Sequence, residues 1–145
     1  MLNLNEQLEL AITIAIDAHK GQCDKGGEPY ILHPLHIMNE VKDIECKIIA
    51  VLHDVIEDTW VDDDYLRMNG INEDCIESVL TLTRKENQSY MDYIKDINYD
   101  FYARIVKLED LKHNMDLSRT NKTITDKDLE RNKKYQKAYY YLLNN

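Results

Sequence analysis

The sequence has little glycine and proline and only three cysteines. Four glycines and two prolines in 145 residues leave few of the turns that separate short strands. Runs of alternating apolar and polar residues are also scarce, so an all-α fold is predicted. Cys23, Cys46 and Cys75 are scattered singly and odd in number, which argues against a disulfide framework and a zinc knuckle. A reducing compartment fits this cysteine content best.

The sequence also lacks an excess of basic charge and any long apolar run. Lys and Arg total 18 against 27 Asp and Glu, giving a formal charge of −9, whereas a nucleic-acid-binding surface needs a basic stripe. No apolar run approaches the roughly 18 residues of a membrane-spanning helix, and the first ten residues, MLNLNEQLEL, lack the basic start and continuous apolar core expected of a secretory signal. We expect a cytoplasmic protein with one domain, residues 1–145, and no nucleic-acid or membrane partner. The oligomeric state stays open.

Apolar residues recur at helical spacing along most of the chain. The pattern predicts helices over residues 5–20, 34–41, 43–59, 62–68, 72–82, 90–97, 101–115 and 126–143. Asp43 and Asn72 stand where they can cap two of these helices. Tyrosine is abundant, and four tyrosines at helical core spacing are expected to pack inside: Tyr90, Tyr93, Tyr99 and Tyr102.

One predicted helix carries an unusual group of polar residues. The segment Lys47–Thr59, KIIAVLHDVIEDT, sets His53, Asp54, Glu57 and Asp58 in a mostly apolar run. Burying an unpaired carboxylate or imidazole costs several kcal/mol, so such groups are normally paired, neutralised or bound to a metal ion. On a continuous helix, residues four apart lie on one face. We therefore predict one convergent polar site.

A second polar group lies on a later predicted helix, where Asp110 and Asn114 share a face close to Lys107 and His113. Taken alone, this group fits an ordinary solvated face. Residues 21–30, GQCDKGGEPY, form a predicted loop with three of the four glycines, and His33 follows it. Together with His33 and the earlier segment, the second group completes a mixed nitrogen and oxygen ligand set: His33, His53, Asp54 and Asp110. Such a set suits Mn²⁺ or Fe²⁺, with Mg²⁺ or Zn²⁺ less favoured. The remaining histidines His19 and His36 are expected to be hydrogen-bonded core or rim residues.

Four motifs carry a family resemblance. They are His19-Lys20-Gly21-Gln22, then GEPYILHP from Gly27 to Pro34, LHDVIEDT from Leu52 to Thr59, and KLEDLKHN from Lys107 to Asn114. In this order the chain resembles the HD-domain alarmone hydrolases, the hydrolase part of RelA/SpoT-type enzymes and their small stand-alone relatives. The resemblance implies an all-α HD-domain helical bundle and Mn²⁺ bound by His33, His53, Asp54 and Asp110. It also implies removal of the 3′-pyrophosphate from the guanosine alarmones ppGpp and pppGpp.

Chemistry and resemblance together suggest roles for other residues. Glu57 and Asp58, one turn beyond the ligands, are expected to act as catalytic residues that orient water or move protons. Four residues are expected to bind substrate: Lys25, Tyr30, Lys107 and Asn114. Lys25 would contact a phosphate. By the family pattern, Asn114 would contact the sugar. Lys107 would meet a phosphate or pair with a nearby acid.

The chain departs from the family pattern at two positions. Asp24 stands where the family has an arginine that packs on the base, and a carboxylate cannot stack in that way. Leu111 replaces an arginine that follows the metal-binding aspartate. Arg84 and Lys85 are candidates to restore the charge, although an exposed helix end is the favoured interpretation for both. The alternatives are therefore an adenosine alarmone as substrate, a phosphatase acting on NADPH or a nucleoside monophosphate, and a non-catalytic nucleotide-binding regulator.

Overall fold

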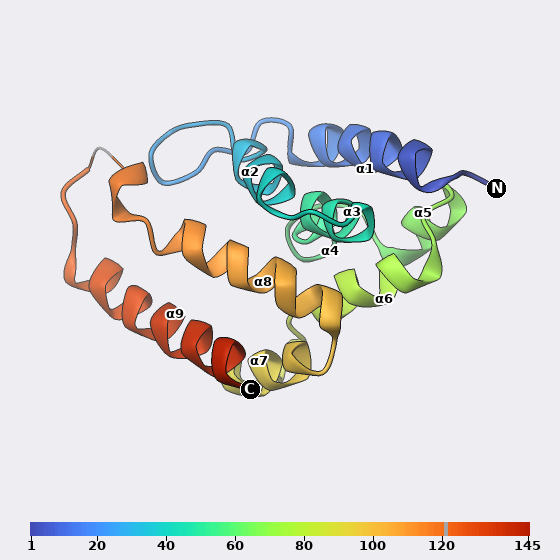
Figure 1. Ribbon diagram of the computed structural model, residues 1–145. Coiled ribbons are helices and arrows are strands. Elements are labelled where there is room, and N and C mark those ends of the chain that lie inside the picture. The colour runs from blue at the N-terminus through green and yellow to red at the C-terminus, as the bar shows by residue number, and fades with distance from the viewer. Residues whose placement is uncertain (121) are drawn as a thin grey trace.

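The computed structural model describes residues 1–120 and 122–145, and every regular element within them is helical (Figure 1). The all-α prediction is therefore confirmed for the described residues. The elements in chain order are α1 (Leu4–His19), α2 (Leu32–Glu40), α3 (Ile44–Leu52), α4 (Val55–Asp58), α5 (Asp63–Met68), α6 (Glu73–Thr81), α7 (Tyr90–Asn98), α8 (Phe101–Asn114), the 3₁₀ turn η1 (Leu117–Arg119) and α9 (Asp126–Asn144).

Helix α3 forms the centre of the molecule. Its residues Ile48, Ile49, Ala50, Val51 and Leu52 are all fully buried, because the second half of this helix is a continuous apolar run. It packs against α1, α2, α6 and α8. Figure 1 shows α1 and α2 above α3, α8 below it, and α9 on the outer side of α8. The C-terminal end of α3, which His53 follows, therefore lies deep between the layers.

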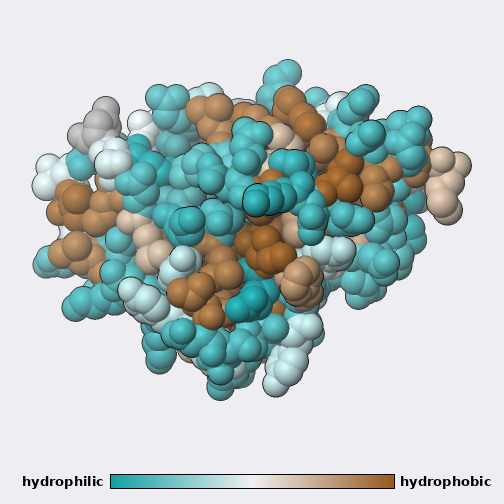
Figure 2. Space-filling model, viewed as in Figure 1, coloured by the Kyte–Doolittle hydropathy of each residue, from teal (hydrophilic) through white to brown (hydrophobic). Residues whose placement is uncertain are grey.

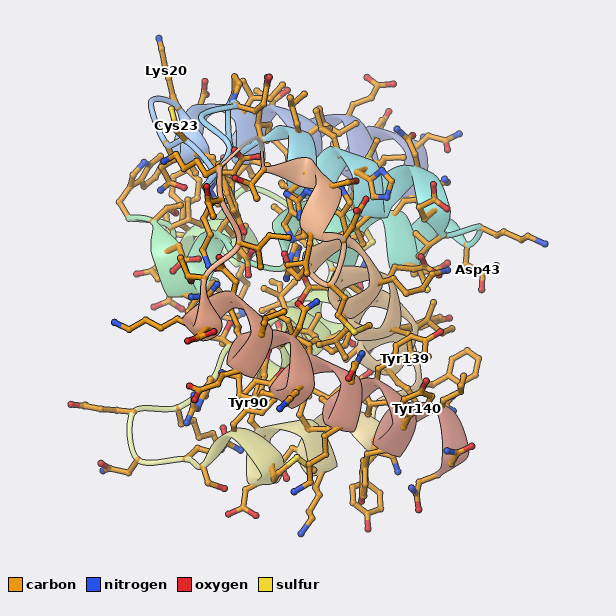
Figure 3. The ribbon with its side chains drawn as sticks, turned by 90° about the vertical axis from the view of Figure 1, so that its left-hand side faces the viewer. Lys20, Cys23, Asp43, Tyr90, Tyr139 and Tyr140 are labelled. Carbon is orange, nitrogen blue, oxygen red and sulfur yellow. The ribbon has the colours of Figure 1, made fainter. Side chains whose placement is uncertain are left out.

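Polar caps begin most of the helices. Asn3 and Glu6 form a capping box at α1, and Asn72 accepts a hydrogen bond from the backbone N–H of Cys75, as predicted for α6. The prediction for Asp43 is wrong in one respect. Asp43 occupies the residue before α3, but its side chain makes no capping bond and lies at the outer edge of the molecule (Figure 3).

The predicted continuous helix over residues 43–59 is also wrong, because it is interrupted at its polar residues. Helix α3 ends at Leu52, and the Nδ1 of His53 lies 2.6 Å from the carbonyl oxygen of Ala50. Asp54 then takes φ −109° and ψ −1°, away from regular helical angles, before α4 begins. The backbone N–H of Asp58 still donates to the carbonyl oxygen of Asp54 at 3.0 Å. The one-turn spacing between these two aspartates therefore survives the interruption.

Two smaller predictions are corrected by the structure. Helix α2 begins at Leu32, and Pro34 is its third residue, where a missing N–H removes no intrahelical hydrogen bond. Tyr93 is buried as expected, whereas Tyr99 is 89% exposed because it lies at the turn between α7 and α8.

Among the described residues, no helix combines the length and the apolar character that a membrane crossing requires. Figure 2 shows a largely hydrophilic face with separate hydrophobic patches.

The loop between α1 and α2 closes against η1. A Cβ atom on Gly26 would lie 2.6 Å from the carbonyl oxygen of Arg119, so only glycine permits this approach. Asp24 holds the loop by accepting hydrogen bonds from the backbone N–H groups of Gly26 and Glu28 at 2.9 and 3.0 Å. Its second carboxylate oxygen lies 3.8 Å from the guanidinium of Arg119. The loop and η1 therefore form one wall.

Candidate active site

Three separate parts of the fold bring the four predicted metal ligands together. His33 lies on α2, His53 and Asp54 at the break between α3 and α4, and Asp110 on α8. The Nε2 of His33 lies 2.8 Å from Oδ1 of Asp110, and the Nε2 of His53 lies 3.5 Å from the same oxygen. Oδ2 of Asp54 lies 3.1 Å from Nε2 of His53. The two histidines and Asp110 are buried, and Asp54 is half-buried.

The donor atoms of this cluster suit a divalent metal ion. Nε2 of His53 is buried and makes no hydrogen bond of regular geometry among the described residues, although Oδ2 of Asp54 lies 3.1 Å away. Its other nitrogen faces the carbonyl oxygen of Ala50, which fixes Nδ1 as the donor and leaves Nε2 as the atom available for a ligand bond. One ligand atom each from His33, His53 and Asp54 lies within 4.8 Å of the others. This spacing and the mixed N/O chemistry fit a bound cation.

A second group of side chains holds the candidate ligands. Lys107 donates to Oδ2 of Asp110 at 2.8 Å, and Asn114 donates to Oδ1 of Asp110 at 3.0 Å. The hydroxyl of Tyr30 donates to Oδ2 of Asp54. Three residues predicted to bind substrate therefore also contact the candidate ligands. Sequence reasoning gave no role to His113, whose Nδ1 lies 2.7 Å from Nδ1 of His33.

The cluster is electrostatically arranged to keep its carboxylates ionised. Burial raises the pKa of Asp110, but Lys107 and the two histidines outweigh it and hold this pKa well below its usual range. Burial likewise raises the pKa of Asp54, and His53 outweighs that effect to bring it to about 2. Burial lowers the pKa of His53, yet Asp54 and Asp110 raise it well above its ordinary value. The acids thus favour a positive charge between them, which a metal ion can supply.

The two predicted catalytic carboxylates lie beside the cluster but are exposed, not buried. One oxygen each from Asp54, Glu57 and Asp58 lies within 4.8 Å of the others. The backbone N–H of Arg84 donates to Glu57 at 3.0 Å. Partial desolvation of the carboxylate group is the main cause that raises the pKa of Glu57 and of Asp58, although both residues are exposed overall, and nearby carboxylates add to it. A raised pKa makes each carboxylate a better proton acceptor.

Two cavities adjoin the cluster. The larger, of about 310 Å³, lies between the loop after α1, η1 and α9, and its walls include Lys25, Tyr30, Asn114, Arg119, Arg131 and Tyr135. The smaller, of about 220 Å³, is lined by candidate ligands and cations, among them Asp54, Glu57, Arg84, Lys107, Asp110 and Lys134. Asn114 and Tyr135 line both cavities, which therefore adjoin each other.

Arg84 was a candidate to restore positive charge near the site, with an exposed helix end as the favoured interpretation, and it is exposed and also lines the smaller cavity. Other cavity residues were missed by sequence reasoning. Arg131, Lys134 and Tyr135 of α9 received no functional role. Their spacing of three and four residues places them on one helix face, which was the available signal. Asp24, which stands in place of the family's arginine, lies in the larger cavity beside Arg119.

Comparisons with known proteins point to one protein family. No family model matches the chain. The guanosine-3′,5′-bis(diphosphate) 3′-pyrophosphohydrolase of Haemophilus influenzae is 33% identical over 118 residues, which are 70% of this chain and 17% of that protein. The bifunctional (p)ppGpp synthase/hydrolase SpoT of Escherichia coli K12 is 37% identical over 125 residues, which are 76% of this chain and 18% of that protein. The chain thus spans less than one fifth of these relatives.

A solved structure shares the fold. It is described as "A metazoan ortholog of SpoT hydrolyzes ppGpp and plays a role in starvation responses", and it matches with a TM-score of 0.76 and 20% identity. The match covers 95% of this chain and 85% of that one, in agreement with the predicted HD-domain helical bundle. The resemblance noted in the sequence motifs is confirmed, and the chain is a homologue of the SpoT-type (p)ppGpp 3′-pyrophosphohydrolases.

Proposed function

We propose that this chain is a metal-dependent phosphohydrolase that removes the 3′-pyrophosphate of ppGpp and pppGpp or of a related adenosine alarmone. One observation carries the proposal: two histidines and two carboxylates from distant segments converge next to two adjoining cavities. The names of the homologous proteins support the substrate class. Both the substrate and the activity are inferred for this chain.

We further propose that His33, His53, Asp54 and Asp110 hold the ion. Mn²⁺ is the favoured ion because two imidazoles and two carboxylates suit it, with Fe²⁺, Mg²⁺ and Zn²⁺ as alternatives. Such an ion, when bound, lowers the pKa of a coordinated water and neutralises charge on a phosphoryl group.

Other residues of the chain would accept the proton from water and bind the substrate. Glu57 and Asp58 lie close to Asp54. Because the pKa of each is raised, either carboxylate can take a proton from the attacking water. Asn114 lies where the two cavities meet, a position that suits the sugar between base and phosphates. Tyr30 and Lys25 line the larger cavity, and Lys107 the smaller. The nucleoside would therefore occupy the larger cavity and the 3′-phosphates the smaller.

We also propose that residues 1–145 form one domain that acts in the cytoplasm on a small nucleotide. The helices around α3 share a single hydrophobic core, which supports one folding unit. All three cysteines are free thiols, and two of them are buried, which suits a reducing compartment.

Product release from the purified Mn²⁺-loaded protein tests the proposed activity. The substrates are ppGpp, pppGpp, ppApp, NADPH and simple nucleoside monophosphates, and Asp54→Ala serves as the blank. We expect pyrophosphate from an alarmone and none from the variant. Orthophosphate from NADPH or a monophosphate would instead establish the alternative phosphatase. No product from any substrate, with metal bound, would favour a nucleotide-binding regulator.

A further inference from the structure

Two cations share one aromatic ring at the edge of the smaller cavity. The Nζ of Lys134 lies 4.4 Å from the centroid of the Tyr90 ring, and the guanidinium carbon of Arg84 lies 5.7 Å from the same centroid. Figure 3 shows Tyr90 between the ribbons of α7 and α9. A ring face attracts cations by about 0.5–1 kcal/mol at exposed sites, so Tyr90 positions both side chains without neutralising them.

Neither cation has a carboxylate partner within the described part of the chain. Arg84 donates through Nε to the carbonyl oxygen of Gln88 at 2.9 Å. Lys107, the third cation of this cavity, is already paired with Asp110 at 2.8 Å. Lys134 is exposed overall, and partial desolvation followed by repulsion from Arg84, Arg131 and Lys107 lowers its pKa. The lining as a whole contains three carboxylates, Asp54, Glu57 and Asp110, and three cations. Because Arg84 and Lys134 have no carboxylate partner among the described residues, they form a locally positive edge that favours a bound anion.

The cavity has the size and the two-sided character that a diphosphate needs. Its volume of about 220 Å³ equals the share of roughly seven water molecules at about 30 Å³ each, which exceeds a single phosphoryl group. Asp54 and Asp110 line it from the candidate metal cluster, whereas Arg84 and Lys134 come from the segment after α6 and from α9. The Tyr90 hydroxyl is buried and has no hydrogen-bond partner among the described residues, so it adds a free polar group.

We propose that Lys134, held on the Tyr90 ring beside Arg84, binds the terminal phosphoryl group of the substrate's 3′-diphosphate and so selects diphosphate esters over monophosphate esters. This inference rests on the proposed function and makes it specific. The phosphoryl group that is attacked lies at the metal cluster, and the terminal one meets the two cations. Lys134 is therefore a specificity-determining residue, and a 3′-monophosphate would not reach it.

A binding measurement tests the inference without requiring turnover. Inorganic pyrophosphate and orthophosphate are titrated calorimetrically into the Mn²⁺-loaded protein, with the heat of each ligand in metal-containing buffer subtracted. Lys134→Met removes the charge and keeps an unbranched chain over the ring. Lys133→Met is the matched control, because Lys133 is exposed on the same helix and lies outside both sets of cavity residues.

We expect Lys134→Met to weaken pyrophosphate binding by about tenfold, the effect of losing one charge-assisted contact, and to change orthophosphate binding by less than about twofold. Lys133→Met should bind pyrophosphate like the unaltered protein. Equal pyrophosphate affinity in all three proteins would overturn the inference, as would an equal loss for both anions. Thermal unfolding of both variants verifies that each is folded.

Turnover provides a second, separate readout. We expect Lys134→Met to lower the ratio of kcat/KM for a nucleoside 3′-diphosphate over the matching 3′-monophosphate by about tenfold. An equal fall for both substrates would contradict selection by Lys134. If the unaltered protein releases product from neither substrate, the proposed function fails, and the pyrophosphate titration alone decides the role of Lys134.

Discussion

The ammonium group of Lys107 lies 2.8 Å from Oδ2 of Asp110, and both side chains are buried one turn apart on α8. Oδ1 of the same carboxylate faces His33 and Asn114. Lys107 therefore neutralises one side of Asp110 and leaves the other side directed at the candidate metal cluster. From the sequence, Lys107 was expected either to contact a phosphate or to pair with a nearby acid. The pairing with an acid is present in this structure.

Lys107→Met should destabilise the metal-free protein by about 3–5 kcal/mol, because it leaves the Asp110 carboxylate buried without its partner. A bound cation can supply the missing positive charge, so the loss should shrink in the Mn²⁺-loaded protein. Urea unfolding with a chelator and with Mn²⁺ measures both values. Lys112→Met, which removes an exposed pair with Glu109, is the control and should cost less than about 1 kcal/mol. Matching losses for the two variants would contradict the prediction.

Tyr30→Phe should weaken Mn²⁺ binding by about 10- to 100-fold, because it deletes the hydroxyl that donates to Asp54 and keeps the ring. Metal titration of the purified protein measures the change. Tyr65→Phe is the control, since Tyr65 packs against Trp60 and lies outside both cavities. An unaltered affinity in Tyr30→Phe would show that the hydroxyl does not support the ligand.

Glu57→Gln and Asp58→Asn separate proton transfer from metal binding. Either change should leave the metal content intact and slow turnover by roughly 100-fold if that carboxylate moves the proton. Metal analysis and steady-state kinetics on the preferred substrate provide the two readouts. Glu77→Gln, an exposed change on α6, should alter neither. Full activity in both site variants would remove the acid–base role from this pair.

His113 should make the metal-free protein sensitive to mild acid. Burial, together with Arg119, His33 and His36, lowers the pKa of His113 to about 4, whereas an unfolded histidine titrates near 6.5. Between these values the unfolded chain binds a proton that the folded chain does not, so stability falls as pH falls. Above about pH 6.5 this contribution has no pH dependence.

The variant His113→Gln removes that titration. With a chelator present, the melting temperature of the unaltered protein should fall relative to that of His113→Gln as pH decreases from about 7 to about 4.5. Thermal scans across this range, referenced to pH 8, measure the difference between the two proteins. A difference that stays constant from pH 8 to pH 4.5 would contradict the lowered pKa.

The helices were predictable from sequence because their signals are local. Asn72 and the apolar spacing after it marked α6, and the helix at the C-terminal end begins at Asp126 as predicted. The interruption at His53 and Asp54 was not predictable, because apolar residues continue at helical spacing on both sides of it. The contact between the His53 ring and the carbonyl oxygen of Ala50 depends on burial, which periodicity does not report.

The site was predictable only in part. The His and Asp residues were singled out because polar groups in apolar runs are conspicuous, and the structure brings them together. Lys134 gave no such signal, since lysine on an amphipathic helix is ordinary. Its importance emerges only when α9 is placed across from Tyr90, two segments that sequence spacing cannot relate.

The candidate ligands His33 and Asp110 are 77 residues apart in the chain, and the fold alone makes them neighbours. An ion held there would act as a reversible cross-link that ties α2, the α3–α4 junction and α8 to one another. Because the unfolded chain has no such arrangement, the binding energy of the ion adds to the cohesion of the whole bundle. Scarcity of the metal would then expose the chain to unfolding and proteolysis as well as to loss of its site.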